Sequence, residues 1–453
     1  MSQARDPFGN PVWLQHAASE QPLHDFIEGF LAYEPRLLNI LGAAEQDHSP
    51  LVQACAAALQ MFSESPAGPP AARRHLAQAR LAGLPASERE LGFTQAVTHW
   101  VEGRPHQALA LHEQLAREHP RDLASIKLGQ YHAFNLGDSA AMLRLALAAR
   151  NAAADVAWLH GLLAFGHEQC HQLPEAETSA RRALAMRAAE PWAEHALAHV
   201  MLTDGRLREG ADFMQHARGP WRQLTSFMRC HNGWHLALFH IELGDDAAAL
   251  ALYDNEVWGV DKGYSQDQVG AVSLLARLEL AGVDVGERWQ DLAEHLAERV
   301  SDQVQPFLDL QYLYGLARAG RAEADRLFIN LQRHAQRAPA DQRQAWQRVA
   351  VPAARGLLAH ARGLAEPRGA AARWTEAVDQ LALALPQLAR IGGSHAQRDL
   401  FEQVYGDALL RSGALGAVLN LLQPRLNAAP QSVRLTRRVT VVRDRLGLTL
   451  PVI

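Results

Sequence analysis

The residues best suited to chemistry in this chain are histidines that recur four residues apart. The chain has 22 histidines among its 453 residues. Residues four apart lie on one face of a helix, so both imidazoles of such a pair would point the same way. Imidazole titrates near neutral pH and ligates transition metals, so such a face could bind a metal, hold an anionic ligand or supply acid and base groups. The pairs are His167/His171, His195/His199, His231/His235 and, five residues apart, His235/His240.

The string HEQCH, residues 167 to 171, matches the H-E-x-x-H pattern of zinc proteases, in which two helical histidines bind zinc and the glutamate serves as base. Such an enzyme needs a third ligand further along the chain, for which Glu190 or Glu194 would be available. However, Pro174 leaves the helix little room beyond the second histidine. A pattern of five residues also arises easily by chance in a histidine-rich chain. The sequence therefore favours a solvated helix end here.

The next pair, His195 and His199, lies in the string PWAEHALAHVM. One interpretation is a helix–helix contact in which each imidazole bonds to a carbonyl or a carboxylate. The other is a site shared with His231 and His235. Two pairs on adjacent helices could supply up to four nitrogen donors in tetrahedral geometry, although a catalytic site would leave one position open. The residues alone leave both interpretations standing.

The string CHNGWHLALFH contains the third pair together with Asn232 and Trp234. Asparagine is unfavourable inside a helix because its side chain competes for backbone hydrogen bonds. Its presence among apolar residues therefore indicates a specific hydrogen bond. A contact that sets the packing register explains this as well as a ligand site does.

A polar stretch, IGGSHAQRDLFEQV, spans residues 391 to 404. Its glycine pair ends one helix and Ser394 caps the next, which places Gln397, Arg398 and Asp399 in the first turns. A guanidinium such as that of Arg398 can bind a carboxylate or phosphate through two parallel hydrogen bonds. The alternative is an arginine–aspartate pair that closes the helical array.

The elements that must position these residues are helices almost everywhere, since no segment shows sustained alternation rich in β-branched residues. Glycines separate an apolar helix from an alanine-rich one at positions 103, 137, 205, 244, 320 and 413. The interval is 34 residues from 103 to 137, 39 from 205 to 244, and 68, or twice 34, from 137 to 205. A period of about 34 to 39 residues is typical of tetratricopeptide repeats. We therefore predict an all-α, tetratricopeptide-like solenoid of antiparallel helix hairpins, about nine to eleven in number. The first helices of successive hairpins would turn their histidines into one concave groove.

We expect one continuous solenoid in three stretches. Residues 1–74 would form an N-terminal arm and capping helices, and residues 75–259 the tetratricopeptide-like repeats. Residues 260–453 would form longer helical repeats and a cap, ending in a short tail at 451–453. The loose stretch 257–268 could be a loop over the inner face.

The net charge and the cysteine content of the chain limit the kinds of partner and the cellular location that we expect. With 44 Lys+Arg against 49 Asp+Glu the formal charge is −5, and no basic face stands out, so nucleic acid is not expected as the main partner. No run approaches the roughly 18 apolar residues of a membrane span, and the N-terminus lacks the apolar core of a signal peptide. Cys55, Cys170 and Cys230 are too scattered for a disulfide framework. We expect a soluble cytoplasmic protein.

Three strings together, PWAEHALAHVM, CHNGWHLALFHIELGDDAAALALYD and GGSHAQRDLFEQ, resemble the tetratricopeptide repeat protein 38 family in order and spacing. The resemblance covers most of the chain and is strongest at 155–282 and 390–405. It implies an all-α, tetratricopeptide-like, intracellular protein and says little about activity. The residues that fall on the family signatures are His195, His199, His231, Asn232, Trp234, His235, Gln397, Arg398 and Asp399.

The sequence supports a binding protein first. Its concave, histidine-rich groove would take a peptide, a protein or a small molecule, with Asn232, Trp234, Gln397, Arg398 and Asp399 as ligand contacts. The alternative is an enzyme in which His195, His199, His231 and His235 act on a small acidic substrate that Arg398 holds. A divalent metal is the one cofactor that the histidines suggest, with its ligands left unassigned. A structural homo-oligomer is a third interpretation.

Overall fold

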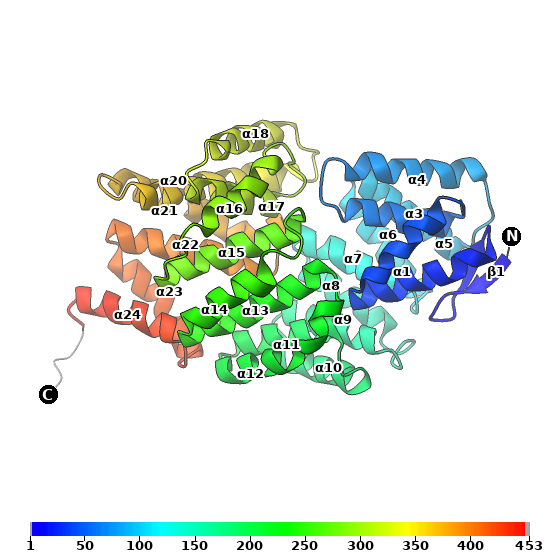
Figure 1. The fold of residues 1–453 in the computed structure, drawn as a ribbon, viewed down its shortest axis with the longest axis horizontal. Helices are drawn as coiled ribbons and strands as arrows, with labels where there is room; N and C mark the ends of the chain where they lie inside the picture. The colour runs from blue at the N-terminus through cyan, green and yellow to red at the C-terminus, as the bar shows by residue number, and fades with distance from the viewer. Residues whose placement is uncertain (1, 449–453) are drawn as a thin grey trace. The chain divides into compact units, whose positions relative to one another are not determined.

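The computed structural model describes residues 2–448, and these are folded almost entirely into helices (Figure 1). The predicted all-α class is confirmed. The tail predicted at 451–453 lies outside the described residues. By their contacts the residues divide into two compact units, unit 1 being Met1–Leu197 with Gly219–Met228 and unit 2 being Ala198–Arg218 with Arg229–Ile453. The ranges predicted from the sequence stay a prediction.

Unit 1 begins with a short hairpin and continues with helices that pack on their neighbours in the chain. Its elements are β1 (Ser2–Arg5), β2 (Pro11–Leu14), α1 (Glu20–Ala32), α2 (Asn39–Ala44), α3 (Pro50–Met61), α4 (Gly68–Ala82), α5 (Glu88–Val101), α6 (Pro105–Glu118), α7 (Leu123–Leu136), α8 (Ser139–Ala149), α9 (Ala157–Gln169) and α10 (Leu173–Met186). Helices two places apart also touch, as α3 does α5 and α7 does α9. Two helices are divided between the units, α11 (Pro191–Thr203) and α13 (Ser226–Leu243).

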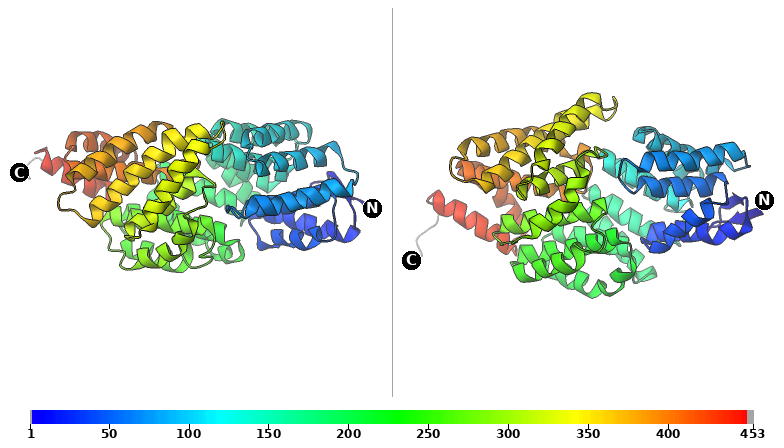
Figure 2. Two further views of the ribbon diagram at one scale, coloured as in Figure 1. Left: turned by 90° about the horizontal axis from the view of Figure 1, so that it is seen from above. Right: turned by 45° about the horizontal axis from the view of Figure 1, so that its top comes forward.

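Unit 2 holds the remaining helices, which Figure 2 shows from two further sides. They are α12 (Leu207–Ala217), α14 (Asp246–Leu252), α15 (Ser265–Ala281), α16 (Arg288–Leu296), α17 (Pro306–Arg318), α18 (Glu323–Arg337), α19 (Arg343–Ala345), α20 (Val351–Ala365), α21 (Ala371–Ala384), α22 (His395–Ser412), α23 (Leu415–Ala428) and α24 (Val433–Arg445). Helix α22 packs against α15, α21 and α23. It therefore brings the 391–404 stretch close to helices from the middle of the chain.

The predicted turn glycines end helices as expected. All six of them have a positive φ, between 69° and 83°. At Gly137 the backbone N–H returns to the carbonyl of Phe134 while φ is 74°, a conformation that a Cβ atom would strain. These turns let each helix fold back onto the one before it.

The N-terminal arm is more ordered than the sequence suggested. Ser2 pairs with Leu14 and Arg5 with Pro11 in an antiparallel hairpin. The Asp6 carboxylate accepts hydrogen bonds from the backbone N–H groups of Phe8 and Asn10, both at 2.9 Å, and so closes the turn. Four-residue strands are too short to show the alternation that identifies a strand in a sequence.

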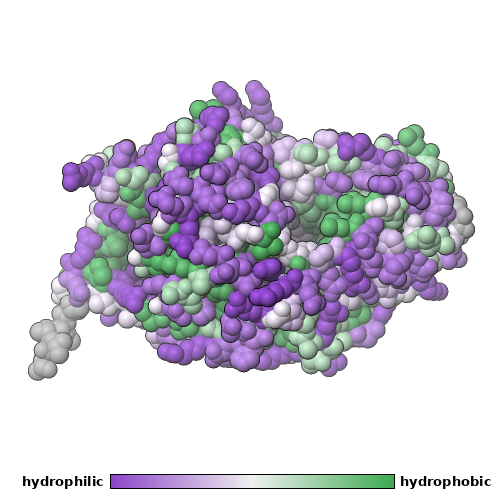
Figure 3. All heavy atoms as spheres, viewed as in Figure 1, coloured by the Kyte–Doolittle hydropathy of each residue, from purple (hydrophilic) through white to green (hydrophobic). Residues whose placement is uncertain are grey.

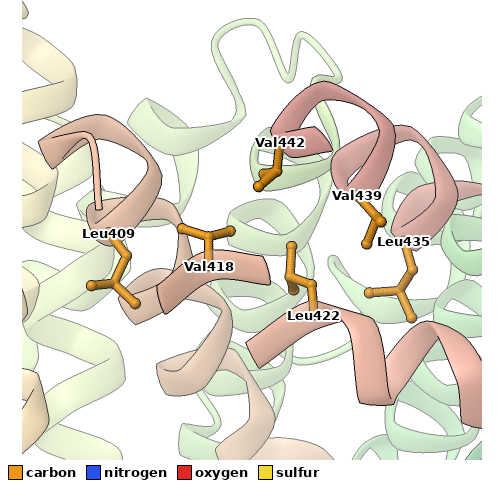
Figure 4. Packing of buried hydrophobic residues seen from close by; sticks show 6 residues of the cluster. All are labelled: Leu409, Val418, Leu422, Leu435, Val439 and Val442. Carbon is orange, nitrogen blue, oxygen red and sulfur yellow. The ribbon is translucent and has the colours of Figure 1, made fainter. Parts of the chain in front are cut away.

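The last three helices of unit 2 are held together by a small aliphatic core. Figure 4 shows its side chains pointing into the space that α22, α23 and α24 share: Leu409, Val418, Leu422, Leu435, Val439 and Val442. All six are at most 6% exposed. Burial of an aliphatic side chain contributes about 1.5–3 kcal/mol, so this core is sufficient to fix α24 against its neighbours.

The surface is mainly hydrophilic on the face that Figure 3 displays, with hydrophobic residues in small groups. Large exposed apolar side chains, such as Leu81 and Leu383, are scattered along the chain. Among residues 2–448 no helix combines the length and the apolar character that crossing a membrane would require.

Candidate functional site

The centre of the candidate site is a group of three histidines in unit 2. His199 comes from α11, and His231 and His235 come from α13. Each offers one ring nitrogen, and these atoms lie within 4.8 Å of one another. The ring centroids are 4.5 Å apart for His199 and His235, and 4.9 Å apart for His231 and His235. We call these three residues, which the structure brings together, the histidine cluster.

The cluster is enclosed. His199 and His235 are fully buried, whereas His231 is half-buried. Trp234, which is 1% exposed, stacks on the His231 ring at 5.4 Å and meets the His235 ring edge to face at 4.7 Å. Because α13 continues for 18 residues, His231 and His235 remain one helical turn apart. The indole therefore fixes the orientation of both rings.

Burial also sets the charge of His231. It lowers the pKa of His231 to about 3, and the neighbouring His199 lowers it further in the same direction. A neutral imidazole keeps the lone pair that a metal ion or a proton needs. At neutral pH the His231 ring is therefore uncharged and keeps a lone pair that could coordinate a metal ion.

Asn232 lies beside the cluster on α13 and is fully buried. Neither its amide nitrogen nor its amide oxygen has a hydrogen-bond partner among residues 2–448. Leaving a buried polar group unsatisfied costs about 1–3 kcal/mol. The specific hydrogen bond that the sequence suggested is thus absent from the described part of the protein.

Two residues that sequence reasoning missed belong to this region. His395 opens α22, and its ring centroid is 5.3 Å from that of His199, with the Thr203 hydroxyl 3.4 Å from its Nε2. It stands inside the string GGSHAQRD but has no histidine four residues away, so the spacing criterion passed over it.

The second is Arg277 of α15, which is 2% exposed. Its guanidinium lies 5.3 Å from the centre of the Trp234 ring and donates to the Ala396 carbonyl at 2.7 Å. A further hydrogen bond, of 2.5 Å, goes to the Ser273 hydroxyl. Burial lowers the pKa of Arg277 to about 10, so the side chain stays charged at neutral pH. Arg277 thus connects Trp234, which packs on the cluster histidines, to the start of α22.

The predicted contacts on α22 are tied into the helix itself. Ser394 and Gln397 form a reciprocal capping box at its N-terminus, and Arg398 donates to the Gly393 carbonyl. Asp399 accepts hydrogen bonds of 2.6 Å from both Arg425 and Gln403. Although burial alone would raise the pKa of Asp399, the charges of Arg425, Arg277 and Arg434 lower it to about 2. Asp399 therefore pairs with Arg425 of α23.

His195 belongs to unit 1, because the division of the chain falls between residues 197 and 198 of α11. It is 1% exposed and stacks on Trp192 with the ring centroids 4.4 Å apart. The ring centroid of Phe165 lies 5.1 Å from that of His195. Helical spacing places His195 on the same face of α11 as His199, one turn earlier.

The zinc-protease alternative for HEQCH is wrong. Helix α9 ends at Gln169, and His171 is exposed with a left-handed φ of 57°. The two histidines therefore do not share a helix face. Of the carboxylates considered as a third ligand, burial raises the pKa of Glu190 to about 7 and that of Glu194 to about 8.

The loop expected over the groove is anchored. After a π-helical turn at Tyr253–Val257, residues 258–264 form the irregular stretch. The Trp258 indole and the Lys262 ammonium donate to Asp291 of α16, at 2.6 Å and 2.8 Å. The loop is therefore fastened to α16.

No family model matches the chain.

Proposed function

We propose that this protein binds a divalent transition metal, zinc first among them, through the histidine cluster. The proposal rests on one observation: the ring nitrogens of His199, His231 and His235 lie within 4.8 Å of one another in a buried setting. Zinc takes imidazole nitrogens at about 2.0–2.1 Å, so tetrahedral ligands stand about 3.3 Å apart. Closing the remaining difference would require only small rotations of the three side chains.

The chemistry of the donors favours zinc, copper or nickel over magnesium or calcium. Imidazole nitrogen suits these transition metals, whereas magnesium and calcium prefer oxygen ligands. The stacked Trp234 keeps two of the rings oriented before the metal arrives. Preorganised ligands lose less conformational freedom on binding and so bind the metal more tightly.

The sequence groups His195, one helical turn before His199 on α11, with the other three histidines, and a substitution tests whether it takes part. Four imidazoles would close the coordination sphere and make the site structural. Three imidazoles would leave one position for water or a substrate, as catalytic zinc sites do. A His195→Ala variant separates the two: a structural site loses most of its metal affinity, and a three-ligand site keeps it.

A small organic ligand is the second candidate, and Asn232 favours it. Its buried amide has a donor and an acceptor without partners among residues 2–448, as an amide that receives a ligand would have. The ligand would be small and acidic if Arg398 also takes part. This is the binding function that the sequence predicted, with a peptide or protein partner as its larger form.

The wider architecture is part of the proposal. We propose a tetratricopeptide-like solenoid of the repeat protein 38 type, because glycine turns recur at the repeat spacing and helices two places apart pack together. Cys55, Cys170 and Cys230 are all free thiols, which suits the reducing cytoplasm.

Metal content of the untagged protein tests the proposal. The protein is loaded with zinc, passed over a desalting column and measured by inductively coupled plasma mass spectrometry beside a His199→Ala/His235→Ala variant. The control is His216→Ala, which removes an exposed histidine of α12 in the same unit. We expect about one zinc per chain in the wild type and the control, and none in the double variant. A wild type that retains no transition metal contradicts the proposal.

A further inference from the structure

Unit 2 contains a second feature suited to binding, a cavity of about 270 Å³ at the side of α24. The ends of α13, α15 and α22 and the start of α14 form its other walls. Four arginines line it: Arg411, Arg434, Arg437 and Arg438. Ile241, Leu280 and Leu410 supply apolar wall. The cavity is separate from the histidine cluster, none of whose residues lines it.

Three of these arginines hold carboxylates and still have donors to spare. Arg434 binds Glu242 at 2.6 Å, and Arg411 and Arg438 bind Asp407 at 2.5 Å and 2.8 Å. A guanidinium has five N–H donors. These ion pairs therefore position the guanidinium groups without exhausting them.

Arg437 differs from the other three. It is exposed and makes no ion pair or hydrogen bond with any residue of the described range 2–448. It sits one turn beyond Val433, whose side chain lies against Gly244 at the end of α13. Arg437 is thus a charged side chain at the edge of the cavity, and its N–H donors are available to a ligand.

The acidic residues of the cavity are mostly neutralised by their own partners. Glu279 accepts two hydrogen bonds from Arg318, at 2.8 Å and 2.9 Å. Asp407 accepts one from His360 at 3.0 Å, besides those from the two arginines. Counting these partners, five arginines face the four carboxylates of Asp246, Glu279, Asp407 and Glu242. One positive charge is left over.

The titration of Asp407 agrees with a positive environment. Burial by itself would raise the pKa of its carboxyl. The hydrogen bond and charge of His360 and the charges of Arg438 and Arg411 instead lower the pKa well below its usual range. A second anion entering the cavity would meet the same arginines.

We propose that this cavity binds a small phosphorylated molecule, with the phosphate held by Arg437 and the spare donors of Arg434 and Arg438. Arginine forks match the oxygen geometry of phosphate, and fixed guanidinium groups lose little freedom on binding. The apolar side chains of Ile241, Leu280 and Leu410 would cover the carbon skeleton. A volume of about 270 Å³ restricts the ligand to a few carbons beyond the phosphate.

Isothermal titration calorimetry with inorganic phosphate, on metal-free full-length protein, tests this. Sodium chloride of equal ionic strength is the reference titration. We expect one saturable phosphate site per chain and about tenfold weaker binding in Arg437→Gln, which loses a charge-assisted hydrogen bond. The control is Arg443→Gln, an exposed arginine on the same helix whose partner is Gln423 and which does not line the cavity. It should bind phosphate like the wild type.

Two results overturn the proposal. One is a wild type whose heat with phosphate does not exceed that with chloride. The other is an equal loss in Arg437→Gln and Arg443→Gln, which would mean unspecific attraction to a basic helix. Circular dichroism verifies that both variants are folded. The His199→Ala/His235→Ala variant should keep phosphate binding, so this result is independent of the metal site.

Discussion

We expect the loss of the buried Arg277 side chain to destabilise the surroundings of the histidine cluster, although Arg277 is not one of its three residues. Replacing it in Arg277→Met leaves the Ala396 carbonyl and the Ser273 hydroxyl without their donor and removes a positive charge near Asp399. Breaking a buried charged contact of this kind costs about 3 kcal/mol. Urea denaturation followed by circular dichroism should show that loss.

The matched control is Arg326→Met on α18, whose side chain is 65% exposed and pairs with Glu323. An exposed pair contributes little, so the control should lie within about 0.5 kcal/mol of the wild type. Equal stability of Arg277→Met and the wild type would show that Arg277 does not hold the start of α22.

Asp399 should make stability depend on acid. Its folded pKa of about 2 lies below the ordinary 3.8, so its charged form stabilises the fold. That contribution is complete above pH 3.8 and is lost as the pH falls towards 2. We expect Asp399→Asn to be less stable than the wild type by about 2 kcal/mol at pH 6.

The difference between wild type and Asp399→Asn should shrink as urea midpoints are measured from pH 5 down to pH 3. Arg425, Arg277, Arg434 and Gln403 are the groups that act on this carboxylate, and the arginines do not titrate in that range. A difference that stays constant over the range would contradict the assignment. Asp379→Asn, an exposed position on α21, serves as the control.

At the scale of the element, the contact between α12 and α13 is close enough to be tested by a single methyl group. A Cβ atom at Gly210 would lie 2.3 Å from the ring of the buried Phe239, which belongs to the helix carrying His231 and His235. Gly210→Ala should therefore destabilise unit 2 by about 2 kcal/mol and weaken zinc binding as α13 moves.

Gly416→Ala on α23 is the counterpart, because a Cβ atom there meets nothing within 4 Å. Alanine is the better helix former, so this variant should be as stable as the wild type or more stable by up to about 1 kcal/mol. Thermal denaturation separates the two variants. Similar melting temperatures for both would mean that α12 and α13 adjust without cost.

The helices could be predicted from the sequence because hydrophobic periodicity and glycine turns are local signals. The turns at Gly137 and Gly413 and the four-residue spacing of His231 and His235 on α13 followed from the sequence pattern alone. The hairpin of β1 and β2 did not, because strands of four residues are too short to show an alternating pattern. Arg277 and His395 could not be found either, since their contacts join residues that are distant in the sequence.

At the scale of the whole molecule, metal binding should stabilise one region selectively. A ligand present at 100 times its dissociation constant stabilises the state that binds it by about 2.7 kcal/mol. Hydrogen exchange measured by mass spectrometry, with zinc and then with EDTA, should show slower exchange in α13 and in the second half of α11. Helices α3 to α6 of unit 1 should exchange equally in both.

The His199→Ala/His235→Ala variant supplies the control for that experiment, because zinc should leave its exchange unchanged. Slower exchange in the variant would place the metal elsewhere. Uniform protection of the wild type along the whole chain would point to general stabilisation by the ion.

Helix α24 has a consequence for handling the protein. Its sequence VRLTRRVTVVRDR contains five arginines and one aspartate, whereas the chain as a whole carries a formal charge of −5 and has a pI near 6.5. Ion-exchange resins respond to the local charge that faces them as well as to the net charge. At pH 7 the protein should therefore be retained by a cation exchanger as well as by an anion exchanger, and phosphate in the buffer should elute it from the former at lower ionic strength than chloride does.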